Sequence, residues 1–210
     1  MRRSALALVV FGALGVQAHA APVFLAATLT NGQERPNPAV PTLSDNTTPR
    51  PASFGTAEFV LNDARTSLAF TATIFNIDFT GTQTADAYDN LTAAHIHAGP
   101  TVTPNTTGGV VWGFFGAPFN DNNPNDLVVT PFATGVGGTI RGKWDAPEGN
   151  NTTLAAQLDN ILSGRSYINF HTTQFGSGEV RGAILQVPEP ASLALVVAAG
   201  LWAGLARRRC

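Results

Sequence analysis

The chain contains little of two residue types on which many functional classes depend, since it has one cysteine and only 12% charged residues in a length of 210. A single cysteine excludes an internal disulfide framework, and it excludes a zinc or iron–sulfur site built from several cysteines. The formal net charge of −2 excludes the overall basic character that is typical of proteins that bind nucleic acid. Because 44% of the residues are hydrophobic, the chain is nevertheless expected to fold.

Sequence motifs of common enzymes are absent as well. The chain has no G-x-S-x-G nucleophile elbow, no phosphate-binding P-loop and no H-E-x-x-H zinc-protease motif. Aspartate and glutamate could supply a pair of catalytic carboxylates, but no spacing marks one. The sequence therefore predicts a protein that is not an enzyme.

The first 20 residues have the three parts of a secretory signal peptide. Met1-Arg2-Arg3 is positively charged, residues 5–16 are apolar, and Ala18-His19-Ala20 is typical of a cleavage site. We therefore expect residues 1–20 to be removed during export.

Residues 187–210 have the composition of a membrane anchor. The stretch from Val187 to Ala206, apolar from Ala191 onward, is about 20 residues long, which is close to what a hydrocarbon core of about 30 Å requires. Arg207, Arg208 and Arg209 follow it directly, and the positive-inside rule keeps such a cluster in the cytoplasm. This pattern predicts a C-terminal transmembrane helix, with the preceding chain outside the membrane.

The same segment resembles the PEP-CTERM sorting signal of Gram-negative bacteria that make exopolysaccharide. The resemblance rests on Pro188-Glu189-Pro190, the apolar run and the arginine cluster, in that order. It implies that an exosortase-type membrane enzyme removes the tail of an inner-membrane-tethered precursor. The mature protein would then reach the cell surface or the extracellular matrix, where exopolysaccharide is a candidate partner.

Between the two end segments, residues 22–186 carry seven basic and thirteen acidic residues, a formal charge of −6. Apolar residues alternate with polar ones in several short runs that glycine and asparagine separate, which is typical of strands joined by turns. The strands containing Phe59 and Phe70 are predicted to form a hairpin. Glu179 and Arg181 share a face of the last run, where we expect a cross-strand ion pair at the sheet edge. The predicted strands lie in residues 24–28, 57–61, 68–74, 93–98, 110–115, 139–144, 167–172 and 179–186.

This pattern predicts one all-β domain over residues 22–186, a Greek-key-like antiparallel β-sandwich. One short helix is expected, capped by Thr152 or Thr153 and ended by Gly164. Its apolar stripe consists of Leu154, Leu158, Ile161 and Leu162. Residues 34–53 and 120–125 are rich in Pro, Asn and Thr, and we expect both to be exposed loops.

Three histidines of this domain are the candidate chemistry. His95 and His97 flank Ile96 in a predicted strand, so their rings project from one face with Cβ atoms roughly 7 Å apart. His171 also lies in a strand, on the face opposite to that of the apolar Phe170. If the two strands meet, three neutral imidazoles can bind one copper or zinc ion.

Two interpretations of the histidines remain open at this point. They are either ligands of a metal ion or hydrogen-bonding residues that organise a loop. A metal site would need a fourth ligand, which Asp86, Asp89 or water could supply, but no spacing selects one of them.

The domain resembles the CHRD domain, which is named from animal chordin. The resemblance extends from about Phe24 to Leu185, and it rests on Ala94-His95-Ile96-His97-Ala98-Gly99, Tyr167-Ile168-Asn169-Phe170-His171-Thr172 and Gly178-Glu179-Val180-Arg181-Gly182. It implies an extracellular β-sandwich. The H-x-H strand and the later histidine are also similar to the copper-binding strands of Cu/Zn superoxide dismutase. The remaining metal-binding histidines of that enzyme have no counterparts here, so dismutase activity is not expected.

These observations lead to two functional hypotheses. The first is an exported, non-catalytic surface or matrix protein whose CHRD domain has a binding or structural role. The alternative is a copper- or zinc-binding domain that uses His95, His97 and His171, with a redox role if the ion is copper.

Overall fold

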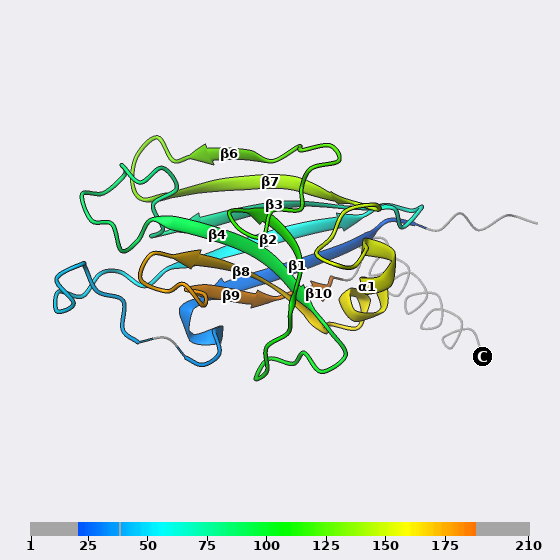
Figure 1. Cartoon of the computed structure of the whole chain (residues 1–210), viewed down its shortest axis with the longest axis horizontal. Coiled ribbons are helices and arrows are strands. Elements are labelled where there is room, and N and C mark those ends of the chain that lie inside the picture. Colours follow the sequence, from blue (N-terminus) through cyan, green and yellow to red (C-terminus); the bar gives the residue numbers. More distant parts are fainter. Residues whose placement is uncertain (1–20, 38, 188–210) are drawn as a thin grey trace, which may run out of the picture.

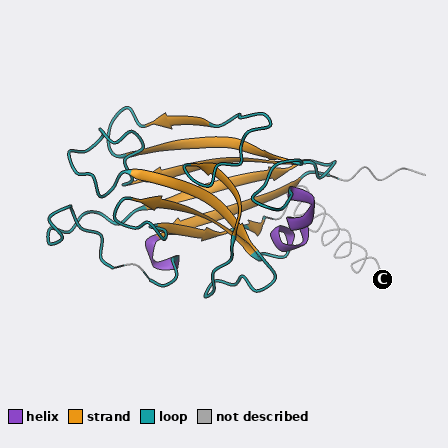
Figure 2. Cartoon of the chain, in the orientation of Figure 1, coloured by secondary structure: helices purple, strands orange, loops and turns teal. Residues whose placement is uncertain are grey.

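The computed structural model describes residues 21–37 and 39–187, and strands and loops make up most of this part (Figures 1 and 2). The predicted signal peptide, residues 1–20, lies outside the described residues. So do Pro188-Glu189-Pro190, the apolar run after them and Arg207, Arg208 and Arg209. Within the described part, no helix has the length and apolar character that a membrane crossing requires.

The described elements are short and mostly extended, which confirms the all-β prediction. The strands are β1 (Val23–Thr30), β2 (Phe54–Leu61), β3 (Ser67–Phe75), β4 (Leu91–Ala98), β5 (Val110–Phe115), β6 (Val128–Pro131), β7 (Gly137–Asp145), β8 (Ser166–Thr172), β9 (Val180–Ala183) and β10 (Leu185–Gln186). The helices are the 3-10 turn η1 (Asn31–Gln33) and the α-helix α1 (Leu154–Leu162).

The described strands pair into one curled antiparallel sheet, in the order β5-β4-β8-β9-β1-β2-β3-β7-β6, with β10 beside β1. A β-sandwich would have two separate sheets, whereas here continuous hydrogen bonding joins the two layers. Curling brings β5 over β3 and β7, as the ring contacts show: Trp112 lies 5.8 Å from both Phe70 and Trp144 between ring centroids. The sheet therefore encloses its core between its own two ends.

Buried and exposed positions alternate in the strands that line one side of this core. In β2, every second side chain is buried and the intervening ones are exposed. Phe59 pairs with Phe70 across β2 and β3, which confirms the predicted hairpin. Strand β6 was not predicted, because its four residues are mostly exposed and follow a polar loop. It lies at the sheet edge, where Pro131 is tolerated.

The helix α1 forms as the sequence predicts. The Thr153 hydroxyl caps it by accepting a hydrogen bond from the Ala156 amide at 3.3 Å, and Gly164 follows it with a φ of +73°. Leu154 and Ile161 bury the apolar side of the helix. Figure 1 shows α1 at one end of the sheet, close to β10.

Strands β4 and β8 are buried on both faces. All seven side chains of β8 are buried, and so are the last six of β4. The apolar residues Ile96, Ile168 and Phe170 belong to the core. The polar residues between them face the other way and are nevertheless shielded from water. A polar site therefore lies beneath the loops on the outer face of the sheet.

Candidate functional site

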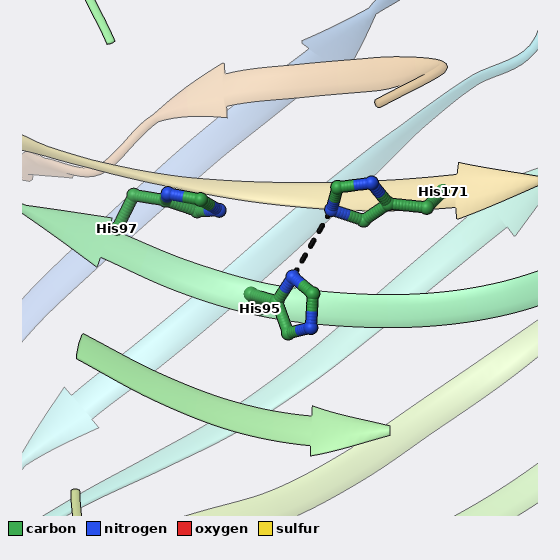
Figure 3. Close-up of side chains that lie close together, drawn as sticks. All are labelled: His95, His97 and His171. Atoms are coloured by element: carbon green, nitrogen blue, oxygen red, sulfur yellow. Dashed lines mark hydrogen bonds between the residues drawn. The ribbon is translucent and has the colours of Figure 1, made fainter. Parts of the chain in front are cut away.

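The structure brings the three predicted histidines together on the outer face of β4 and β8 (Figure 3). His95 and His97 alternate with Ile96 on β4, and His171 lies opposite Ala93 on the adjacent strand β8. One nitrogen from each ring lies within 4.8 Å of the others. The condition on which a shared site depends, that the two strands meet with their histidines on one face, is therefore met.

Each ring contacts a backbone carbonyl with the nitrogen that points away from the cluster. His95 Nε2 lies 3.0 Å from the Ala117 oxygen, His97 Nδ1 lies 2.9 Å from the Gly108 oxygen, and His171 Nδ1 lies 3.0 Å from the Gly176 oxygen. The three carbonyls belong to three different loops. Because a carbonyl only accepts hydrogen bonds, each of these nitrogens carries the ring proton.

This arrangement leaves three lone pairs inside the cluster, on His95 Nδ1, His97 Nε2 and His171 Nε2. The first and third of these atoms are 3.0 Å apart. The neutral rings of His95 and His171 have one N–H group each, and each N–H donates to a backbone carbonyl. No hydrogen therefore remains between the two facing nitrogens. His97 Nε2 is buried and has no hydrogen-bond partner among the described residues. A shared cation would satisfy this set of acceptors.

Burial keeps all three rings neutral. It lowers the pKa of His95 and of His97 to about 4, with the neighbouring rings adding to the effect. Burial also lowers the pKa of His171 below its ordinary value. At neutral pH the rings therefore present the uncharged form that binds a metal ion.

Asn169, which no sequence pattern marked, places a further oxygen acceptor beside the rings. Its Oδ1 lies 3.2 Å from His171 Nε2, and its backbone pairs with His95 across the sheet. The aspartates considered as a fourth ligand are used elsewhere. Asp86 accepts hydrogen bonds from Ser44, and Asp89 accepts one from Thr84.

A column of stacked side chains supports one side of the site. The His97 ring stacks on Tyr167 at 4.6 Å with the planes 7° apart. The Arg181 guanidinium lies 3.7 Å from the centroid of the Tyr167 ring. Arg181 also donates to the backbone oxygens of Thr103 and Thr106, at 2.8 Å each. The Arg181 guanidinium therefore contacts both the Tyr167 ring beneath His97 and the loop after β4.

The cross-strand ion pair that we expected at the sheet edge is wrong, because Glu179 forms a buried pair with a residue from a loop. Glu179 is fully buried and receives two 2.7 Å hydrogen bonds from the Arg50 guanidinium. Arg50 comes from the loop between β1 and β2, so the pairing depends on a long-range contact. The hydroxyl groups of Ser53 and Thr172 complete the shell of this carboxylate.

Residues 34–53 and 120–125, the first and second polar inserts, are only partly the exposed loops that their composition predicts. Glu34, Arg50 and Ser53 of the first insert are buried, and so is Asp121 of the second. The first insert is buried at its ends because Arg50 and Ser53 bind Glu179 and Glu34 lies against Gly178. These loops therefore help to cover the polar face of the sheet.

The comparisons with known proteins are consistent with this architecture. A model of the CHRD domain matches residues 25–184, which contain all three histidines, Asn169 and Arg181. Searches of curated proteins and of solved structures each found no match. The family is generally a non-catalytic one. Because the match covers most of the 210 residues, the chain belongs to the CHRD domain family.

Proposed function

We propose that this protein is an exported, non-catalytic CHRD protein whose three histidines bind one divalent copper or zinc ion. The observation that carries the proposal is the set of three neutral rings whose outer N–H groups are directed at backbone carbonyls. Ligand histidines in metalloproteins usually have such outer hydrogen bonds, because these fix the tautomer and orient the ring. Here the three inner lone pairs converge, with ligand atoms within 4.8 Å of one another.

The donor set favours copper or zinc over harder cations. Imidazole nitrogens suit both ions, and the order of stability places Cu(II) above Zn(II) at the same site. Asn169 Oδ1 or a water molecule would supply the fourth ligand. Each carbonyl that orients a ring comes from a separate loop, so binding of the ion would also hold the loops after β4, β5 and β8 together.

Titration of the full chain with Cu(II) and Zn(II) tests this proposal. The comparison uses a Cys210→Ser background, so that the thiol does not compete for the metal. We expect one ion to bind per chain, and His97→Ala to weaken binding by at least tenfold. Ile96→Val, on the same strand but directed at the core, serves as the matched control and should bind as the parent does. Equal uptake by the His97→Ala variant and the control would overturn the proposal.

Export and surface sorting are the second part of the proposal, and the terminal sequences support them. The signal-peptide pattern of residues 1–20 and the tail containing Pro188-Glu189-Pro190 predict processing by an exosortase-type enzyme. The domain would then act at the cell surface or in an exopolysaccharide matrix. Deletion of residues 187–210 should change where the protein is found after cell fractionation. An unchanged location would refute the sorting role.

A further inference from the structure

The outer face of five neighbouring strands carries a row of threonines. Strands β1, β2, β3, β7 and β6 lie side by side in the sheet (Figure 1). In β1, β2, β3 and β7 the positions on both sides of each of these threonines are buried, so the hydroxyl groups share the outer face. Because adjacent strands are about 4.8 Å apart, the row is about 19 Å long. The register pairs Thr28 with Thr56, Thr56 with Thr73, Thr73 with Thr139 and Thr139 with Thr130.

The hydroxyl groups of this threonine row are available to a partner. Three of the five residues are exposed and two are half-buried. Within the described residues their hydroxyl groups form no hydrogen bond, in contrast to those of Thr84 and Thr106 in the loops. Each hydroxyl group can donate one hydrogen bond and accept others. The row therefore presents a regular series of donors and acceptors, which suits a partner that is itself rich in hydroxyl groups.

Aromatic rings border the threonine row on one side. Phe54 and Phe75 are paired across β2 and β3, and their rings stack with centroids 4.8 Å apart and planes 11° apart. Phe132 extends this group, with its ring centroid 5.1 Å from that of Phe75. Phe54 is nevertheless 50% exposed and Phe75 is 38% exposed. These rings form an apolar ridge beside the row, and covering it with C–H groups of a partner would be favourable.

Charged and hydrogen-bonding groups border the row on its other side. Glu58, Thr71 and Arg141 are paired in register on β2, β3 and β7, and all three are exposed. A hollow of about 370 Å³ opens beside them, and Asp126 and Lys143 contribute to its lining together with Thr71 and Arg141. This side of the face therefore presents donors and acceptors of both charge signs, which can hydrogen-bond an uncharged polar ligand.

The charge of this face favours an uncharged partner. The charged residues of the five strands are Glu58, Arg141, Lys143 and Asp145, and their formal charges cancel. Residues 22–186 as a whole carry a formal charge of −6, so a polyanion would be repelled by the rest of the domain. A polycation would find no net negative charge along the row. Because neighbouring strands are rotated by about 20–25°, the row is twisted, which suits a single flexible chain better than a flat crystalline surface.

We propose that the outer face of β1, β2, β3, β7 and β6 binds a single chain of an uncharged polysaccharide along the threonine row. Sugar hydroxyl groups bind the threonines and the polar groups beside Thr71, and the apolar C–H faces of the sugars cover the ridge of Phe54 and Phe75. This inference rests on the surface or matrix role proposed above and deepens it, because it names a partner and a binding face. It does not depend on the histidine site, which belongs to β4 and β8.

Affinity electrophoresis of the full chain, in native gels that contain a soluble polysaccharide, tests the proposal. The detergent has no sugar headgroup, so that it does not compete for the face. Hydroxyethylcellulose, galactomannan and dextran are the uncharged probes, and alginate is the anionic comparison. We expect at least one uncharged polymer to retard the chain and alginate not to retard it. Retardation by none of the uncharged polymers, or by alginate as strongly as by them, would overturn the proposal.

Substitutions on the face show whether the retardation arises there. Thr73→Val removes the central hydroxyl group but keeps the branched shape that suits a strand, and it should weaken binding by about 2- to 10-fold. Thr73→Ser keeps the hydroxyl group and should bind as the parent does. Phe54→Ala should weaken binding by a similar factor through loss of ring contact. Thr92→Val, at an exposed position of β4 outside this face, is the matched control and should leave binding unchanged.

Three outcomes separate this proposal from its alternatives. Binding that neither Thr73→Val nor Phe54→Ala weakens would overturn the assignment of the face. A change of oligomeric state in Thr73→Val, measured by sedimentation without polysaccharide, would overturn it in favour of a second copy of the chain as the occupant. An unchanged location after deletion of residues 187–210 would refute sorting alone, because retardation of the purified chain does not depend on where the cell places it.

Discussion

Replacement of Arg50 by methionine should destabilise the fold because it leaves a buried charge without its partner. The guanidinium donates to both oxygens of Glu179 at 2.7 Å, and the two side chains are 4% and 0% exposed. Breaking such a pair usually costs about 3–5 kcal/mol, since the remaining ion stays in a medium of low dielectric constant. The hydroxyl groups of Ser53 and Thr172 still reach the carboxylate, so we expect a loss of about 3 kcal/mol.

Urea denaturation at pH 7 in the presence of a chelator measures this loss as a change in the free energy of unfolding. The double variant Arg50→Met/Glu179→Met removes both charges and should recover most of the loss, because apolar replacement of a whole buried pair is often close to neutral. Lys143→Met is the control for half-exposed ion pairs. Its ammonium is 35% exposed and lies 3.1 Å from Asp126 and 2.9 Å from Asp145, and its removal should cost less than about 1 kcal/mol. Two results would contradict the cost of an unpaired buried charge. Arg50→Met could cost no more than Lys143→Met, or the double variant could be no more stable than the single one.

Further predictions concern a glycine with positive φ, the cap of helix α1 and the response of stability to pH. Gly178→Ala should cost about 1–3 kcal/mol in urea denaturation, because the φ of +128° is strained for alanine. A loss below about 0.5 kcal/mol, which is the range typical of surface substitutions, would contradict this. Thr153→Ala should cost about 1 kcal/mol in the same assay through loss of the helix cap, and an unchanged midpoint would count against that cap. In the chelator-treated chain, the melting temperature should fall from pH 7 to pH 5, because His95 and His97, with pKa values of about 4, bind fewer protons in the folded state than in the unfolded state. Glu34 has a raised pKa and opposes this trend, so Glu34→Gln should steepen the fall; an equal or shallower fall would contradict its raised pKa.

Local sequence patterns predict most of the strands and the shared face of the histidines. A period of two decides which side chains of a strand point together, so His95 and His97 could be placed opposite Ile96 without knowledge of the fold. The cap at Thr153 is local in the same sense. Such patterns do not determine which strands become neighbours, and the single curled sheet instead of a two-sheet sandwich is a consequence of that pairing.

The residues that the sequence analysis missed depend on contacts between distant segments. Glu34 and Arg50 lie in a polar stretch whose composition predicts exposure, and their burial follows from contacts with Gly178 and Glu179. Asn169 alternates with apolar neighbours. This pattern places it on the polar face of the strand but does not predict that its Oδ1 lies near His171 Nε2. The one available signal was the tight grouping of polar residues with glycine around β8 and β9. It marks a buried polar site without identifying the partners.

We propose that three neutral imidazoles present converging lone pairs to one divalent cation. Long-range ¹H–¹⁵N NMR of the histidine rings at pH 7, before and after addition of one equivalent of Zn(II), tests it most directly. In the metal-free chain we expect protons on His95 Nε2, His97 Nδ1 and His171 Nδ1, as the three carbonyl contacts require. Zn(II) should then shift the resonances of His95 Nδ1, His97 Nε2 and His171 Nε2. A doubly protonated ring in the metal-free chain, the opposite tautomers, or ring nitrogens that do not respond to Zn(II) would contradict the account.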